Sequence, residues 1–191
     1  MSEVSLPIVA FDDILSWTRW LEKNHTNTSG IWIQFFKKTT KITSINHDEA
    51  LDEALCYGWI DGQAKPYDEK SWLQKFTPRR KRSMWSKINR ERVARLIQIG
   101  KMKEAGFKEV EKAKIDGRWD AAYDSPSNMT VPEDFLKELS KDKKAKDFFD
   151  SLNKTNTYAI VWRLQTAKKP ETRERRMKII LEMLAKEEKF H

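Results

Sequence analysis

The stretch Ala54-Leu55-Cys56-Tyr57-Gly58-Trp59-Ile60-Asp61-Gly62 joins the end of a predicted helix to the start of a predicted strand. Gly58 stands where a left-handed residue ends a helix, because glycine adopts that conformation without steric cost. The helix is expected to begin at Asn46, since Glu49 follows three residues later with the spacing of a capping box. Such a junction indicates a chain that mixes helices with a small sheet.

Helical and extended patterns surround this junction. Residues 12–24 predict an amphipathic helix capped by Asp12. Residues 31–38 predict a strand, and its two apolar faces indicate a central strand that is covered on both sides. Residues 59–64 and 71–76 predict the two strands of a hairpin, with turn residues between them.

The C-terminal third reads as helical throughout. Residues 124–128 are the best linker candidate, and Thr130 with Glu133 has the spacing of a capping box. A stripe at Ala145, Phe148, Phe149 and Leu152 has helical periodicity. The predicted fold class is therefore α+β, with a small antiparallel or mixed sheet. We expect an α+β domain at residues 1–123 and a helical unit of about three helices at 124–191.

Composition bounds the class of protein. The chain has 191 residues and a net charge of +8, and its eight Trp and nine Phe can build a core. No apolar run approaches the roughly 20 residues that span a bilayer, so no membrane insertion is expected. The N-terminal segment lacks the features of a signal peptide, and there is one cysteine, which together favour a cytoplasmic protein. One Cys and three scattered His predict no zinc site, and no other metal or cofactor is predicted.

Basic residues concentrate between Lys75 and Arg95, where nine Lys and Arg accompany the single acid Glu91. Four of them are consecutive at 79–82, just before a helix that Ser86 is expected to cap. Exposed helix N–H groups and arginines together suit an anion, and tryptophans nearby could stack on a base. The alternative is a solvated basic loop with tryptophans in the core. Because residues 48–53 are acidic, we expect a dipolar molecule.

Catalytic motifs are absent from the sequence, including the glycine-rich phosphate loops, the nucleophile elbow and the H-E-x-x-H helix. Cys56 and His47 lie nine residues apart on one predicted helix, roughly 13 Å along its axis, too far to act together. His47 is expected to be exposed, and histidine catalysis is poorly supported. Asp61, beside Gly62, is either a turn or salt-bridge residue, a ligand-binding group or a general base.

Several blocks of sequence occur in an order that resembles the YdeI/OmpD-associated family, also labelled OmdA or bacteriocin-protection. The blocks are Trp17-x-x-Trp20-Leu21-x-x-Asn24-His25, Gly30-Ile31-Trp32, residues 50–62, Phe76-x-Pro78-Arg79-Arg80-x-x-Ser83-x-Trp85-Ser86-x-x-Asn89, Gly117-Arg118-Trp119 and Ala167-Lys168-Lys169-Pro170-Glu171-Thr172-Arg173-x-Arg175-Arg176.

The resemblance covers about residues 11–185. It implies a bacterial protein associated with an outer-membrane porin and with tolerance of cationic antimicrobial peptides, often periplasmic. The chain departs from this in its N-terminal segment, and a basic protein has little electrostatic reason to sequester cationic peptides. The resemblance supplies no catalytic residues.

Three functions follow as hypotheses. The first is a non-enzymatic, stress-related cytoplasmic protein that binds an anionic ligand or nucleic acid. The second is an enzyme of unknown class in which Asp61 is the acid or base and arginines orient an anionic substrate. The third is a module that binds a protein partner through an exposed apolar stripe. The candidate ligand-binding residues are Trp59, Asp61, Arg79, Arg80, Arg82, Ser83, Trp85, Ser86, Lys87, Asn89, Arg118 and Trp119.

Overall fold

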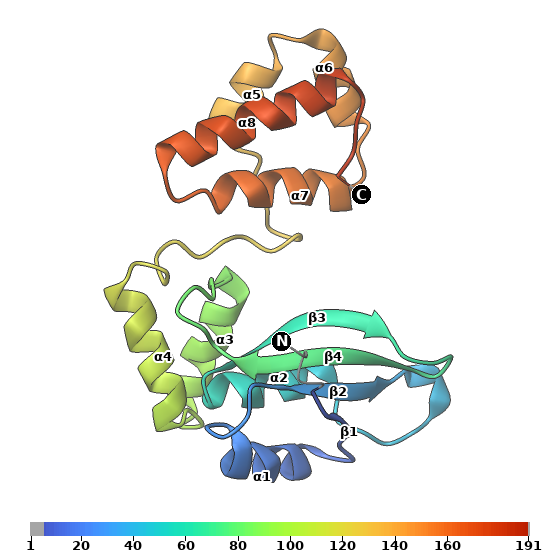
Figure 1. Cartoon of the computed structure of the whole chain (residues 1–191), viewed down its shortest axis with the longest axis vertical. Helices are drawn as coiled ribbons and strands as arrows, with labels where there is room; N and C mark the ends of the chain where they lie inside the picture. Colours follow the sequence, from blue (N-terminus) through green and yellow to red (C-terminus); the bar gives the residue numbers. More distant parts are fainter. Residues whose placement is uncertain (1–5, 191) are drawn as a thin grey trace, which may run out of the picture. The chain divides into compact units, whose positions relative to one another are not determined.

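The structure, a computed structural model, describes residues 6–190 and divides the chain into two compact units (Figure 1). The first, here called the sheet unit, comprises Met1–Ser83 and Asn89–Asp120. The second, here called the helical unit, comprises Met84–Ile88 and Ala121–His191. The predicted α+β class is confirmed, because one unit contains a mixed sheet with helices and the other is helical.

The sheet has four strands in the order β1-β2-β4-β3. The strands are β1 (Ile8–Ala10), β2 (Ile31–Phe36), β3 (Trp59–Pro66) and β4 (Ser71–Pro78). β1 pairs with β2 in parallel, and the other two pairs are antiparallel. The predicted hairpin and the central position of β2 are confirmed. β1 was not predicted, because three residues are too short to show a strand pattern.

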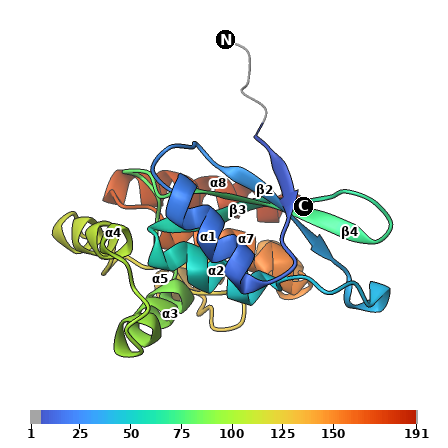
Figure 2. The ribbon, with the colours of Figure 1, turned by 90° about the horizontal axis from the view of Figure 1, so that it is seen from below.

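Two helices cover one face of the sheet, α1 (Ile14–Asn24) and α2 (His47–Cys56) (Figure 2). The capping box of α2 is present, with Asn46 and Glu49 each accepting from the other's backbone N–H. The cap of α1 is Asp13, not Asp12 as predicted, because Asp13 adopts the extended backbone and accepts from the Ser16 N–H at 2.7 Å. Gly58 follows α2 at a φ of 73°, as expected.

Tryptophans build the core between these helices and the sheet. Trp17 on α1 is fully buried, contacts Phe76 and Trp59 edge-on, and donates from Nε1 to the Ala50 carbonyl at 3.1 Å. Trp59 donates from Nε1 to the His25 carbonyl, also at 3.1 Å. Each indole N–H therefore has a partner, which removes the cost of burying it.

The face of β2 that carries Trp32 is less buried than predicted, since the sequence predicted that both faces are covered. Ile31, Ile33 and Phe35 are buried, but Trp32 and its face are only half-buried. Lysine side chains lie over the Trp32 ring, with Lys65 Nζ 4.4 Å from the ring centroid. Trp32 is thus partly covered by lysine ammonium groups, which make cation–π contacts with its ring.

The sheet unit is completed by η1 (Lys38–Thr40), α3 (Lys87–Gln98) and α4 (Glu104–Ile115). The predicted helix after Ser86 is confirmed, and its first two residues group with the helical unit. α4 approaches α2 closely at Gly106, where an added Cβ would lie 2.3 Å from the Cys56 carbonyl oxygen. Only glycine permits this approach without a shift of backbone.

The helical unit contains α5 (Glu133–Leu139), α6 (Lys143–Asp150), α7 (Lys154–Gln165) and α8 (Pro170–Ala185), one helix more than expected. α5 has Pro132 at its N-cap with no side-chain capping bond, so the predicted cap at Thr130 is wrong. The core includes Phe135, Phe149, Ile160 and Ile180. None of the described helices is long and apolar enough to cross a membrane.

The expected apolar stripe on α6 is covered within the helical unit. Phe149 is buried in the core, and Phe148 and Leu152 pack against it half-buried. The stripe is therefore mostly covered by the helical unit itself, with Phe148 left partly accessible. In the segment predicted as a linker, Asp124 and Ser125 are buried, and the Tyr158 hydroxyl donates to the Asp124 carbonyl at 3.1 Å.

Candidate functional site

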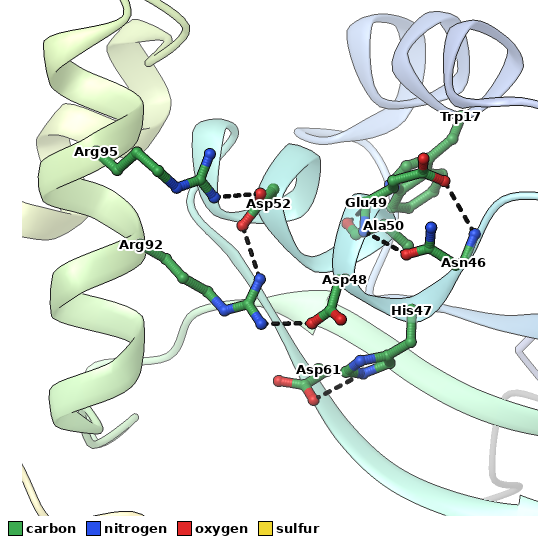
Figure 3. Close-up of polar contacts among 10 residues, drawn as sticks. All are labelled: Trp17, Asn46, His47, Asp48, Glu49, Ala50, Asp52, Asp61, Arg92 and Arg95. Atoms are coloured by element: carbon green, nitrogen blue, oxygen red, sulfur yellow. Dashed lines mark hydrogen bonds and ion pairs between the residues drawn. The ribbon is translucent and has the colours of Figure 1, made fainter.

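The structure brings Asp61 to His47, a pairing that the sequence did not suggest (Figure 3). His47 is the first residue of α2, placed by the capping box, and Asp61 is the third residue of β3. His47 Nε2 lies 3.2 Å from Asp61 Oδ2, and both side chains are about one-third exposed or less. His47 was expected to be exposed, but it is half-buried against the rings of Phe35, Trp72 and Phe76.

A shift in strand register follows Asp61 directly. The pairing of β3 with β4 changes between Asp61 and Ala64, so the bulge lies at Gly62 and Gln63. Gln74, buried on β4, donates to the Gly62 carbonyl at 2.7 Å and thereby satisfies the backbone at the bulge. Bulges of this kind redirect side chains and occur often beside binding sites. The Asp-Gly pair singled out in the sequence is therefore a bulge next to a polar pair.

A pocket of about 640 Å³ lies beside His47. Its wall includes the aromatic rings of Phe35 and Trp72, the capping residue Asn46 and the cation Lys37. Asp61 is not part of the wall, so it contacts His47 from outside the pocket. A carboxylate behind a histidine at the edge of a pocket is the arrangement of an oriented general base.

Acidic and basic residues that are far apart in the sequence meet between α2 and α3 (Figure 3). Arg92 bonds Asp52 at 2.9 Å and also contacts Asp48, and Arg95 contacts Asp52. Burial acts to lower the pKa of Arg92, but its bonds to Asp52 and Asp48 outweigh this and raise it. Asp48 and Asp52 of the acidic helix thus pair with Arg92 and Arg95 of the basic run.

Two arginines from separate segments line a second pocket, of about 400 Å³, here called the arginine pocket. Arg79 follows β4 and is 7% exposed, and Arg118 follows α4 and is 4% exposed. Arg118 donates from Nε to the Asp116 carboxylate at 2.8 Å and from Nη1 to the Ser83 carbonyl at 2.9 Å. The remaining wall consists of Lys81, Glu109, Lys112, Ile115 and Asp116.

The other basic residues of the loop lie elsewhere. Arg80 and Arg82 are exposed and do not line the arginine pocket. The Arg80 N–H donates to the Ser83 hydroxyl at 2.9 Å, so Ser83 fixes the turn. Asn89 is half-buried at the start of α3.

Ser86 and Lys87 belong to the helical unit. Ser86 forms an isolated β-bridge with Tyr123, and the Lys87 N–H donates to the Tyr123 carbonyl at 2.9 Å. The Lys87 ammonium lies 2.6 Å from Asp124. The start of α3 therefore has a backbone partner and a charge partner within its own unit.

Two of the three tryptophans among the candidate residues are buried in the core of their units. Trp59 in the sheet unit and Trp85 in the helical unit are each about 1% exposed, so neither presents a ring face to solvent. Trp119 is half-buried, with the Arg90 guanidinium 5.2 Å from its ring centroid and an Arg90 bond to its carbonyl at 2.9 Å. Trp59 and Trp85 therefore offer no ring face to a ligand, and the Trp119 ring already contacts Arg90.

Sequence reasoning did not select His47, Lys81 or Lys112 for a site. Lys112 lies in the last turn of α4, six residues before Arg118. This short separation was the one sequence feature that could have placed Lys112 near the candidate Arg118. Lys81 was within the basic run. His47 gave no signal, because its partner Asp61 lies in another element and strand register cannot be read from the sequence.

Metal and thiol chemistry find no support in the described residues. Between Leu6 and Phe190, no group of three or more His, Cys, Asp or Glu is placed to hold a metal ion. Cys56 is buried, and burial raises the pKa of its thiol to about 12, so the thiol is protonated at neutral pH.

Two family models match the chain. Residues 9–109 match a model described as Domain of unknown function (DUF8412), which covers more than half of the chain. Residues 128–187 match a model described as Bacteriocin-protection, YdeI or OmpD-Associated (OmdA), which confirms the suspected family. A search of curated proteins and a search of solved structures found no match. The chain therefore belongs to the DUF8412 family and carries a YdeI/OmpD-associated (OmdA) domain over α5–α8.

Proposed function

We propose that this protein binds a small anionic ligand, such as a phosphorylated metabolite, in the arginine pocket, without catalysing a reaction on it. The observation that carries the proposal is the burial of two guanidinium groups, Arg79 and Arg118, in the wall of one pocket. Taking a charge out of water is costly, so buried arginines are retained where an anion or a carboxylate meets them.

The charges around the pocket favour an anion. Four cations and two carboxylates line it. Glu109 already bonds Lys112 at 2.6 Å, and Asp116 bonds Arg118 at 2.8 Å. Because cations outnumber carboxylates, the wall carries a net positive charge. A phosphate or carboxylate group would gain charge-assisted hydrogen bonds, which are stronger where water is partly excluded.

The position of Arg118 is fixed before any ligand binds. Its Nε bonds the Asp116 carboxylate, and its Nη1 bonds the Ser83 carbonyl, so the guanidinium plane is held from two sides. Nη2 takes part in neither of these bonds. A preorganised group loses little side-chain entropy when it binds, which favours affinity. Ser83, selected from the sequence as a ligand contact, supports the pocket in this proposal by holding Arg118.

The description of the OmdA model, bacteriocin-protection, suits a stress-related role without identifying a ligand. Direct capture of a cationic bacteriocin is disfavoured, because the chain itself carries a net charge of +8. An anionic ligand is attracted both by the net positive charge of the chain and by the cations that line the pocket.

Isothermal titration calorimetry with inorganic phosphate, pyrophosphate, AMP and citrate tests the proposal. Arg79→Gln is expected to weaken binding at least tenfold, whereas Arg80→Gln is the matched control, because Arg80 is its exposed neighbour outside the pocket. Lys81→Gln, on an exposed side chain of the wall, should weaken binding without affecting folding. Equal affinities for wild type, Arg79→Gln and Lys81→Gln, or no binding by any of these anions, would refute the pocket.

A proton-transfer enzyme is the second candidate, favoured by the Asp61–His47 pair beside its own pocket. In this role His47 would be the base and Asp61 the positioning residue, which revises the hypothesis that Asp61 is the base. Hydrolysis of p-nitrophenyl acetate is a direct probe. Loss of activity in His47→Gln but not in His25→Gln would support a base at position 47. Activity at the level of buffer alone would exclude it for this ester.

A further inference from the structure

The face of the sheet opposite α1 and α2 combines an accessible indole with lysines. Trp32 lies on this face of β2 and is half-buried. Lys65 of β3 and Lys75 of β4 reach over its ring, with Nζ atoms 4.4 Å and 5.9 Å from the ring centroid. Lys75 is the direct cross-strand neighbour of Trp32. Three strands thus contribute to one cationic, aromatic surface, here called the lysine face.

The lysine face carries positive charge that no carboxylate on its strands offsets. Strand residues alternate between faces, so the residues that share the face of Trp32 follow from the pairing registers. Within the four strands as described, the charged residues on this face are Lys65 and Lys75, and Asp61 lies on the opposite face with His47. Neither lysine forms an ion pair in the described part of the chain, in contrast to Arg92 and Lys87.

We propose that the lysine face binds single-stranded nucleic acid, with an unpaired base stacked on Trp32 and its flanking phosphates on Lys65 and Lys75. An aromatic ring that a base can reach accepts any base, because every base has a π-face. Four-stranded sheets with aromatic residues on one face recognise single strands in this manner. A duplex keeps its bases stacked on each other and offers only phosphates to the same surface.

The lysines fit the phosphate role because of where their ammonium groups lie. In the unbound protein Lys65 occupies the ring face by a cation–π contact, which is worth less at an exposed site than at a desolvated one. A base would displace this ammonium from the ring, and its flexible stem then reaches the adjacent backbone phosphate. The site is independent of the arginine pocket, since the two share no residue.

Fluorescence anisotropy with a labelled 12-nucleotide single strand, over a salt series, tests the proposal on the full chain. The proposal expects Trp32→Ala to weaken binding roughly 5- to 150-fold, the range measured for loss of one stacked base. Lys65→Gln with Lys75→Gln should reduce the slope of log K against log salt by about 1.4, since a single strand contributes about 0.7 for each neutralised phosphate.

Matched controls separate stacking from charge. Lys23→Gln with Lys101→Gln removes the same charge from exposed lysines outside the lysine face and should change the slope by much less. An abasic strand of equal length keeps the phosphates and lacks the bases, so it should bind as weakly as the intact strand binds Trp32→Ala. Should Trp32→Ala fail to fold, Trp32→Phe and the abasic strand still test stacking.

Three results would overturn the proposal: no binding of the intact strand at low salt, equal affinity for the intact and abasic strands, or equal affinity for a polyglutamate of matched charge. The last two would show a surface that binds any polyanion. Arg79→Gln should leave strand binding within about twofold. Failure of the arginine pocket and failure of the lysine face are therefore separate outcomes.

Discussion

His47 Nε2 contacts Asp61 Oδ2 at 3.2 Å across fourteen residues of sequence, one at the start of α2 and the other on β3. The capping box determines where α2 begins, and the bulge after Asp61 determines where β3 changes register. The capping box places the His47 side chain, and the bulge lies beside the Asp61 side chain. The pair therefore depends on two local structures, one at the start of α2 and one in β3.

Breaking this pair is expected to cost about 0.5–1.5 kcal/mol of folding stability, the usual range for a partly exposed hydrogen bond. Asp61→Ala and His47→Ala should each lower the free energy of unfolding, and the double variant should cost less than the sum of the two. Urea denaturation at pH 7 measures all four proteins. Strict additivity would mean that the contact contributes nothing to stability.

The local structures were predictable, because each depends on a few neighbouring residues. Asn46 with Glu49 predicted the start of α2, Gly58 predicted its end, and the two strands after it were predicted as a hairpin. β1 was missed because it pairs in parallel with a strand that is distant in the sequence. Its three residues are also too few to show the alternation of apolar and polar residues that is typical of a strand.

The site was less predictable, because it depends on tertiary neighbours. Arg79 and Arg80 are adjacent and chemically identical, yet one is buried in a pocket wall and the other is exposed. Trp59 and Trp32 likewise lie on opposite faces of the sheet, and only Trp59 is buried. The basic run suggested a binding surface, but Arg92 is neutralised by Asp48 and Asp52, which lie about forty residues away.

The Asp52–Arg92 pair is expected to be stronger than an ordinary surface ion pair. Both side chains are about one-quarter exposed, and Arg92 bonds two carboxylates at once. A double-mutant cycle with Asp52→Asn and Arg92→Gln should give a coupling energy of about 1 kcal/mol or more. The exposed Glu104–Lys108 pair, at helical spacing, is the reference and should give a smaller coupling energy, because solvent screens exposed charges.

Salt distinguishes the two ion pairs further. Raising the ionic strength to 1 M should reduce the Glu104–Lys108 coupling more, relative to its value at low salt, because exposed charges are screened more than partly buried ones. Equal couplings at low salt would indicate that the bond network at Arg92 is offset by the cost of desolvating it.

Gly106→Ala is expected to destabilise the sheet unit, although alanine is the better helix former. The new Cβ would lie 2.3 Å from the Cys56 carbonyl oxygen, which is a backbone atom and cannot rotate away. Overpacking costs about 1–3 kcal/mol, and a clash with backbone belongs at the upper end of that range, so the gain in helix propensity of about 1 kcal/mol offsets only part of it.

Gly62→Ala is the matched control for Gly106→Ala, since its nearest neighbour would lie 3.8 Å from the new Cβ. Thermal unfolding followed by circular dichroism at 222 nm compares the two variants with wild type. A Gly106→Ala variant as stable as wild type would mean that α2 and α4 separate at little cost.

Asp124 is expected to make the stability of the helical unit depend on pH. Burial acts to raise the pKa of this carboxyl, but hydrogen bonds from Lys87 and Gln165 outweigh it, and the folded-state pKa lies below the ordinary value of 3.8. A carboxyl with a lowered pKa adds stability above its unfolded pKa, and that stability is lost as the pH falls through the folded value.

Asp124→Asn should therefore lower the stability at pH 7 by about 1.5–3 kcal/mol, the range for a hydrogen bond to a charged group. The difference from wild type should shrink as the pH falls below about 4, because wild-type Asp124 then loses its charge as well. Asp120→Asn, at an exposed carboxyl with no ion pair in the described part of the chain, is the control. A difference between Asp124→Asn and wild type that stayed constant from pH 7 to pH 3 would show that shape, rather than charge, makes Asp124 important.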